Sequence, residues 1–254
     1  MLDFYRFKDF EKYPSLFHAV TTKSDSLPHH FSLALHTGED KQGIIHNRQT
    51  LAKQLHLKTK THFIVANQTH SANITVIDKK STKGWESLET AIEDSDALIT
   101  NLPNTILTIL TADCVPVLLY DPEQKVVAAI HAGWKGTEAQ IVTKTVQKMQ
   151  DIFGSNPSNI IAGIAPSIGR CCYEVGEDVA KHFFDIPKAY TPLHEKYMLD
   201  LPYINKEQLL KSGIKEAHIC MSNICTACDY KHFFSYRKEA GCSGRFMSMI
   251  GLEG

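Results

Sequence analysis

The densest run of apolar residues along the chain lies between Thr105 and Thr137. Three β-rich apolar segments occur there: Thr105–Thr111, Val115–Tyr120 and Lys125–His131. The four residues between the second and third segments, Asp-Pro-Glu-Gln, have the composition of a tight turn. The pattern therefore predicts a hairpin of two buried strands, preceded by a third strand.

The turn also predicts a register for this hairpin. If its four residues form the loop, Tyr120 faces Lys125, and counting back along both strands places Cys114 opposite His131. Directly opposed side chains have Cβ atoms about 4.5–5.5 Å apart. One metal ion at about 2.3 Å from sulfur and about 2.0–2.1 Å from imidazole can bridge that gap. Pro116 cannot donate a ladder hydrogen bond, so a bulge that shifts this register is the alternative.

A strand-to-helix turn follows at Ala132–Gly136, and Thr137-Glu138-Ala139-Gln140 has the pattern of a capping box. Such a turn offers backbone N–H groups and the positive end of a helix dipole to a phosphate. Gly133 would allow close approach and Lys135 would add a cation, although an ordinary strand-to-helix connection is the alternative. The helix that follows is expected to bury one face: Ile141, Val142, Val146, Met149, Ile152 and Phe153.

Weaker patterns predict the other elements. The expected strands are Leu16–Thr22, Thr61–Ala66, Asn73–Asp78, Asp96–Thr100, Asn159–Ile164, Ala217–Met221 and two in the tail, joined by a turn at Gly241–Gly244. The expected helices are Gly43–Leu57, with Asn47 and Arg48 off its apolar face, Tyr173–Phe184 and Pro202–Gly213.

The central strands are apolar on both faces. Val115, Val117 and Leu119 point one way, whereas Leu118 and Tyr120 point the other. Strands buried on both sides need cover on both sides, and the strands do not alternate strictly with helices. We therefore expect one α+β domain over residues 1–254, with sheets stacked on each other or under helices.

Composition narrows the class of protein. Of 254 residues, 43% are hydrophobic and 22% charged, and the formal net charge is −1, which argues against a nucleic-acid-binding protein. No apolar run approaches the roughly 20 residues of a membrane span, and the first twenty residues lack the pattern of a secretory signal. The seven cysteines are therefore expected to be reduced, and the protein to be cytoplasmic with no membrane partner.

Three residues form a candidate metal site, because His70, Cys114 and His131 each end or follow a β-rich run. Two imidazoles and one thiolate, with a fourth position open, are typical of catalytic zinc, and such zinc activates water or polarises a substrate. Asp113 could orient one imidazole. The alternative enzyme is a cysteine hydrolase with Cys114 as nucleophile and His131 as base.

Other cysteines suggest a weaker site. Cys225-x-x-Cys228 is half of a zinc knuckle with no second pair at the usual spacing. We expect these two to be structural thiols, neither disulfide-bonded nor essential to chemistry, although His218 and His232 flank them and a small metal site is the alternative. The adjacent pair Cys171-Cys172 is not expected to chelate one metal, because neighbouring side chains diverge in extended structure.

Several motifs occur in one order along the chain: NQTHSANI, SDALIT, TADCVPVLLYDP, AAIHAGWKGT, GIAPSIGRCCYEVGEDV and FFSYRKEAGCSGRFMSMIGL. In this order they resemble the laccase-domain family, also called the YfiH-like or multicopper polyphenol oxidoreductase family. The match spans nearly the whole chain. The sequence departs from the family pattern near Asp25–His30, where the usual Gly-Gly-Val-Ser turn is missing. This segment is expected to form the amino-terminal wall of the pocket, on which the preference among purine bases depends.

The resemblance implies a single-domain α/β/β/α layered sandwich with mixed sheets and a zinc ion held by His70, Cys114 and His131. It implies purine nucleosides (adenosine, inosine, guanosine and methylthioadenosine) cleaved with phosphate, together with adenosine deamination. In the same comparison, His36 and Arg48 match residues of the pocket or phosphate site. Arg170 and Arg245 are further candidate cations for an anion. Copper ranks behind zinc, because multicopper oxidation needs clustered histidines and the thirteen here are scattered.

Overall fold

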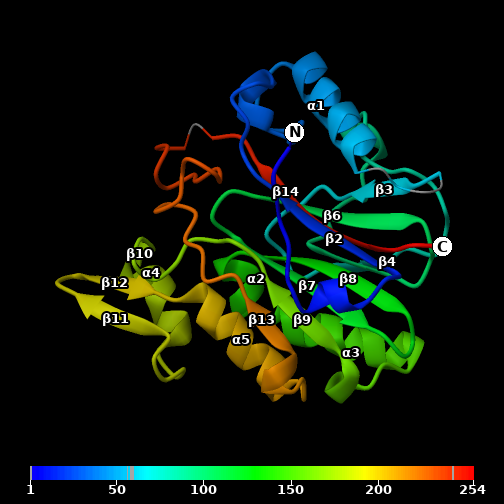
Figure 1. Cartoon of the computed structure of the whole chain (residues 1–254). Coiled ribbons are helices and arrows are strands. Elements are labelled where there is room, and N and C mark those ends of the chain that lie inside the picture. The colour runs from blue at the N-terminus through cyan, green and yellow to red at the C-terminus, as the bar shows by residue number, and fades with distance from the viewer. Residues whose placement is uncertain (1, 56, 58–59, 242) are drawn as a thin grey trace.

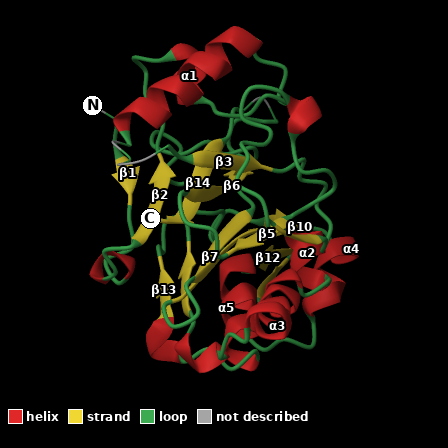
Figure 2. Ribbon diagram, turned by 90° about the vertical axis from the view of Figure 1, so that its right-hand side faces the viewer, coloured by secondary structure: helices red, strands yellow, loops and turns green. Residues whose placement is uncertain are grey.

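Four layers make up the computed structural model, which describes residues 2–55, 57, 60–241 and 243–254. Helix α1 (Lys41–Gln54) covers a five-stranded sheet, this sheet packs on a six-stranded sheet, and helices α3 (Ile141–Phe153) and α5 (Leu201–Lys211) cover the far side. Figure 2 shows the layers from the side. The expected α/β/β/α sandwich with mixed sheets is thereby confirmed.

The five-stranded sheet has the order β1-β2-β14-β6-β3. Its strands are β1 (Phe4–Tyr5), β2 (Leu16–Thr21), β14 (Phe246–Leu252), β6 (Thr105–Thr111) and β3 (His62–Val65). Only β3 and β6 pair in parallel; the other neighbours are antiparallel. Because β14 lies between β2 and β6, the last strand of the chain occupies the middle of this sheet.

The six-stranded sheet has the order β13-β9-β7-β8-β5-β4. Its strands are β13 (Ile219–Met221), β9 (Ile161–Ile164), β7 (Val115–Asp121), β8 (Val126–Ala132), β5 (Ala97–Thr100) and β4 (Ile74–Val76). A small third sheet contains β10 (Glu174–Val175), β12 (Lys196–Leu199) and β11 (Tyr190–Leu193), next to helix α4 (Glu177–Ala180). The sequence patterns did not predict the β11–β12 hairpin.

Alternating side chains divide the apolar core among the layers. Val115, Val117 and Leu119 pack with α3 and α5, whereas Leu118 and Tyr120 pack between the two large sheets. This is the alternation expected for β7, and it explains why the strand is apolar on both faces. In the part of the chain that the structure describes, no helix has the length and apolar character needed to cross a membrane.

The hairpin forms, but its register differs from the prediction by two positions. Tyr120 pairs with Val127, and His131 pairs with Pro116 rather than with Cys114. The loop has the expected four residues but lies one position later, at 122–125, because β7 runs on to Asp121, whose Oδ1 accepts hydrogen bonds from the N–H groups of Glu123 and Gln124. A register shift of two positions keeps every side chain on its expected face of the sheet. Cys114 therefore still lies on the same face as His131, diagonally across the two strands and not directly opposite.

The expected capping box is wrong. Helix α2 (Trp134–Glu138) already contains Thr137, whose side-chain oxygen accepts a hydrogen bond from Asn205, and α3 begins only after Gln140 in the left-handed conformation. The buried face of α3 is otherwise as expected, except for Ile152, which is 51% exposed. Tertiary contacts between α2 and α5 therefore decide this helix start, rather than local capping.

Two other expected elements are also wrong. The segment 173–184 holds short pieces, β10 and α4, instead of one helix, and β14 is the only strand, instead of two, among the tail residues that the structure describes. Asn47 and Arg48 were expected off the apolar face of α1, but both are fully buried. Their side chains bond to backbone carbonyl groups of neighbouring loops, which a hydrophobic pattern does not reveal.

Candidate metal centre

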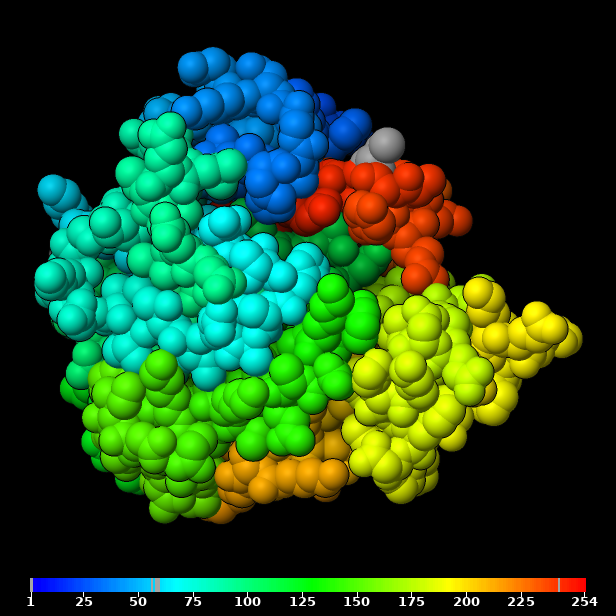
Figure 3. Space-filling view, turned by 180° about the vertical axis from the view of Figure 1, so that it is seen from behind, coloured from blue at the N-terminus to red at the C-terminus, as the bar shows by residue number. Residues whose placement is uncertain are grey.

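A cavity of about 530 Å³ lies beside the start of β7 and the end of β8. Figure 3 shows the surface hollowed where cyan, orange-red and green segments meet. Loops from distant parts of the sequence line it: His36, Gln68, His70, Leu110, Thr111, Ala112, Asp113, Cys114, His131, Trp134, Ile168, Tyr173, Tyr236, Arg237 and Arg245. Its size is within the roughly 300–1,000 Å³ typical of small-molecule sites.

The structure brings together His70, Cys114 and His131 on one wall of this cavity. One donor atom from each lies within 4.8 Å of the other two, and the two imidazole rings are 4.8 Å apart at 76°. His70 follows β3 in the left-handed conformation, Cys114 precedes β7, and His131 belongs to β8. Two nitrogens and one sulfur at this separation suit a single transition-metal ion.

Gly133 makes room for the three donors. A Cβ atom at this position would lie 3.1 Å from His70 Cδ2 and 3.2 Å from Cys114 Sγ. Both distances are shorter than ordinary van der Waals contact, so a larger residue would push against two of the candidate ligands. Glycine at this position therefore leaves room for the candidate ligands, whereas the sequence suggested that it allows close approach of phosphate.

Asp96 organises the centre, and the sequence patterns did not single it out. Its Oδ1 accepts from His131 Nδ1 at 2.7 Å and from the His70 N–H at 3.1 Å. Its Oδ2 accepts from the N–H and the hydroxyl of Ser71, both at 2.7 Å, and from the Thr69 N–H at 3.2 Å. Because a carboxylate only accepts, Nδ1 of His131 carries the proton and Nε2 is left for a metal.

Asp113, which its place beside Cys114 made a candidate to orient an imidazole, bonds to other groups instead. Its carboxylate accepts hydrogen bonds from Thr226 Oγ1, Ser235 Oγ and the Arg237 N–H, each at 2.7 Å. The residue also has a φ of 89°. Asp113 therefore fixes the loop before β14 as one wall of the cavity, while Asp96 holds the histidines.

Electrostatics favour an ionised pair in the metal-free protein. Burial raises the pKa of the Cys114 thiol, but the charge of His131 and hydrogen bonds with His131 and His70 outweigh it, lowering the pKa from 9.0 to about 6. Burial lowers the pKa of His131, but Cys114 and Asp96 outweigh that effect and raise it to about 9. Hydrogen bonding and the charge of His131 hold the pKa of Asp96 well below its usual range, against the opposing effect of burial.

These values predict how metal affinity depends on pH. Between pH 6 and 9 the metal-free site contains a thiolate and an imidazolium, so binding must expel one proton and affinity should rise about tenfold per pH unit. Below pH 6 Cys114 also binds a proton, so affinity should fall more steeply. Competition with a chromophoric chelator across this range measures the slope. An affinity that stays constant from pH 6 to 9 would contradict the predicted pair.

Two of the cations predicted for phosphate lie away from the cavity. The Arg48 side chain is fully buried, and its guanidinium bonds to the carbonyl oxygens of Leu33, Gly84 and Trp85. It is not among the residues that line the cavity, so we expect another cation to bind phosphate. Lys135 is exposed and lies over the Trp134 ring, also outside the cavity lining.

Arg245, Arg237 and His36 are the basic residues that do reach the cavity, besides the two candidate metal ligands. Arg245 and His36 also line an adjoining hollow of about 450 Å³. Burial lowers the pKa of Arg245, and burial together with the charges of Arg245 and Arg48 lowers that of His36. Arg237 lies over the ring of Tyr173 and was not among the predicted residues.

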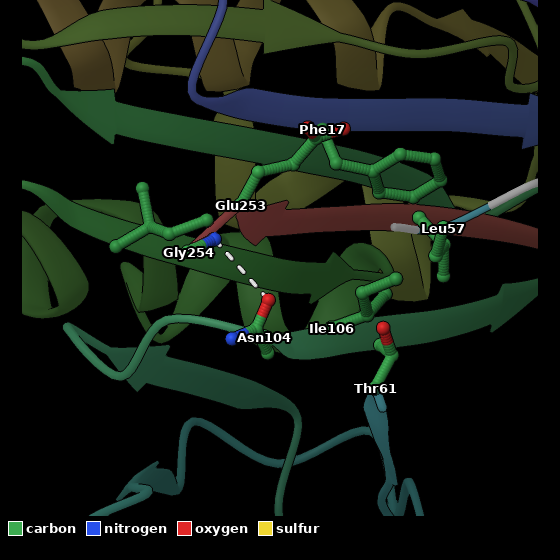
Figure 4. A pocket seen from close by; sticks show the side chains of 8 residues that line it. Phe17, Leu57, Thr61, Asn104, Ile106, Glu253 and Gly254 are labelled. Atoms are coloured by element: carbon green, nitrogen blue, oxygen red, sulfur yellow. Dashed lines mark hydrogen bonds between the residues drawn. The ribbon is translucent and has the colours of Figure 1, made fainter. Parts of the chain in front are cut away.

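A separate crevice near the carboxyl end has no features of a catalytic site. Figure 4 shows its lining, with Phe17, Leu57 and Ile106 beside the hydrogen bond from the Gly254 N–H to Asn104. It holds only about 10 Å³, which is about the least that one water molecule needs and too little for a nucleoside.

Comparison with known proteins identifies the family. The sequence profile described as multi-copper polyphenol oxidoreductase laccase matches residues 17–253. Purine nucleoside phosphorylase YlmD of Bacillus subtilis is 34% identical over 225 residues, or 86% of this chain and 81% of that protein. Adenosine deaminase RL5, from an unknown prokaryotic organism, is 34% identical over 229 residues, 86% of each. The crystal structure of YlmD from Geobacillus stearothermophilus superposes with a TM-score of 0.89 at 30% identity, covering 95% of this chain and 93% of that one. The chain therefore belongs to the multi-copper polyphenol oxidoreductase laccase family.

Proposed function

We propose that this protein is a zinc-dependent purine nucleoside phosphorylase that also deaminates adenosine. The observation that carries the proposal is the position of His70, Cys114 and His131 together on the wall of a nucleoside-sized cavity. Relatives with the names purine nucleoside phosphorylase and adenosine deaminase support it. Adenosine, inosine, guanosine and methylthioadenosine are the proposed substrates, and the proposed location is the cytoplasm.

The donor set favours zinc over copper. Two imidazoles and one thiolate leave one of four tetrahedral positions for substrate or water, as in catalytic zinc sites. A copper site of the electron-transfer type would add a weak axial ligand such as Met or Gln. No Met lies among the residues lining the cavity, and the amide of Gln68 is bonded to the Leu110 backbone through both its oxygen and its nitrogen. When bound, zinc would polarise a substrate atom or lower the pKa of a water molecule toward ~7.

Other residues of the cavity are suited to bind the two substrates, the nucleoside and phosphate. Tyr173 and Tyr236 offer aromatic surface against which a purine can stack. Nη1 of Arg245 donates to the carbonyl oxygens of Ser243 and Gly244, and the other N–H groups of this planar guanidinium are proposed to hold phosphate. His36 lines the cavity beside it. Phosphate bound there attacks the anomeric carbon of the ribose. The bond to the base then breaks, yielding free base and ribose 1-phosphate.

Arg245 supplies the test of the phosphate site. Replacing it by Ala should raise the KM for phosphate about 10–100-fold, because a charge-assisted contact contributes roughly 1.5–3 kcal/mol. The matched control is Arg170→Ala, because Arg170 lies outside this cavity and near Asp200. Release of base from inosine should depend on phosphate and yield ribose 1-phosphate. Release at an equal rate without phosphate, with free ribose as product, would make the protein a nucleoside hydrolase.

One feature of the centre favours a second candidate, a cysteine hydrolase. Cys114, His131 and Asp96 are arranged as a nucleophile, a base and an orienting acid, and the low pKa of Cys114 is typical of reactive cysteines. Metal content separates the two candidates. Under the phosphorylase proposal, His131→Ala removes zinc from this centre, and a strong chelator abolishes base release. A metal-free protein that keeps full activity, and loses it on alkylation of Cys114, would establish the hydrolase.

A further inference from the structure

Four cysteines from two separate segments meet outside the catalytic cavity. Cys171, Cys172, Cys225 and Cys228 each place their sulfur within 4.8 Å of the other three. None of the four is in a disulfide. In the sequence, Cys225-x-x-Cys228 is half of a zinc knuckle without a second pair, and in the structure the adjacent pair Cys171-Cys172 supplies the missing partners.

The adjacent pair can face one point because it does not lie on a strand. The N–H groups of Cys172 and Tyr173 both bond to the carbonyl oxygen of Gly169, which closes a turn. From this turn, Cys171 Sγ lies 3.6 Å and Cys172 Sγ 3.4 Å from Cys228 Sγ. The expectation that neighbouring side chains diverge holds for extended chain, and it is wrong for this turn.

We propose that these four cysteines form a second metal site, a closed tetrahedral zinc site. Sulfur atoms at about 2.3 Å from zinc lie roughly 3.8 Å from one another in a tetrahedron, and the observed sulfur separations, 3.4 Å, 3.6 Å and otherwise up to 4.8 Å, bracket that distance. Four thiolates and no open position are typical of a structural site, in contrast to the three donors of the catalytic centre. His218 and His232 are not part of the cluster.

The surrounding backbone already stabilises a thiolate. The Gly169 N–H donates to Cys225 Sγ at 3.3 Å. A donated N–H is the contact that a thiolate accepts, and the thiolate is the form of cysteine that binds a metal ion.

The proposed site joins two loops that line the catalytic cavity. Cys171 and Cys172 lie between Ile168 and Tyr173, and Cys225 and Cys228 lie in the segment that crosses from β13 to β14 and carries Tyr236 and Arg237. An isolated β-bridge between the backbones of Ser167 and Cys225 already holds the two loops side by side. A zinc ion here would therefore fix the wall of the cavity without taking part in the reaction.

Counting metal ions tests the proposal. The reduced protein should hold about two zinc ions per chain, rather than the single ion expected from the sequence. Cys228→Ser and His131→Ala should each lower the count by about one, and the double variant should hold almost none. Cys220→Ser is the matched control and should keep both ions, because the Cys220 thiol bonds to Asp9 outside the cluster.

Cobalt substitution identifies the donors without altering the cluster. In His131→Ala, the remaining cobalt should show the thiolate charge-transfer and visible bands of tetrahedral all-sulfur coordination, and Cys228→Ser should lack them. Cys228→Ser should also lower Tm by on the order of 10 °C, as for loss of a tightly bound ion, while zinc remains on the catalytic centre. Unchanged zinc content in Cys228→Ser, iron in place of zinc, or a disulfide to Cys228 in protein kept reduced would each overturn the proposal.

Discussion

Asp96→Asn should lower the affinity of the catalytic centre for zinc about 10–100-fold, the usual effect of losing a residue that orients a metal ligand. Both carboxylate oxygens of Asp96 face donors, from His131 and His70 on one side and from Thr69 and Ser71 on the other. An amide nitrogen only donates, so either orientation of the Asn side chain places N–H groups against N–H or O–H groups. Metal titration, together with base release per folded molecule, measures the loss.

Asp94→Asn is the matched control for this prediction. Asp94 is exposed and bonds the same loop, accepting from Thr69 Oγ1 and Asn73 Nδ2, but it contacts neither imidazole. Its variant should keep zinc and activity. If Asp96→Asn binds zinc as tightly as the unchanged protein, then Asp96 does not position His131 for the metal.

Arg48→Met should destabilise the protein by about 3 kcal/mol or more, and this is the largest stability effect that we expect. The guanidinium is buried and donates four hydrogen bonds of 2.6–2.8 Å to three carbonyl groups, on Leu33, Gly84 and Trp85. Each carbonyl left without a donor costs roughly 1–3 kcal/mol. The variant would also lose the contacts that hold two loops against α1, one containing Leu33 and the other containing Trp85. Denaturant unfolding measures the difference.

Lys53→Met on the same helix is the control, because Lys53 is exposed and its replacement should change stability by no more than about 0.5 kcal/mol. Kinetics then distinguish a structural role of Arg48 from a role in binding phosphate. The folded fraction of Arg48→Met should keep the KM for phosphate of the unchanged protein. A stable Arg48→Met variant with a much higher KM for phosphate would restore the role that the sequence resemblance implied for this arginine.

Local chemistry in the sequence determined much of the fold. Strands such as β6 and β7 were predicted within a residue, because two apolar faces on a short β-rich run leave few other structures. The segments 173–184 and 233–241 were not, because their conformations depend on contacts with other loops. The Arg237 backbone bonds to Asp113, for example, 124 positions away in the chain.

In the candidate site, too, the sequence determined some features and the tertiary structure determined others. Motif and residue type were enough to single out His70, Cys114 and His131, since few other side chains bind a transition metal. The sequence could not reveal that Asp96 holds both histidines, that Arg48 is directed into backbone carbonyls and Arg245 toward the cavity, or that Cys171 and Cys172 meet Cys225 and Cys228. The contacts of Asp96, of Arg48 and among the four cysteines join residues 15 to 57 positions apart. Spacing along a chain specifies such contacts only within a helix turn or a hairpin, so the tertiary structure decided them.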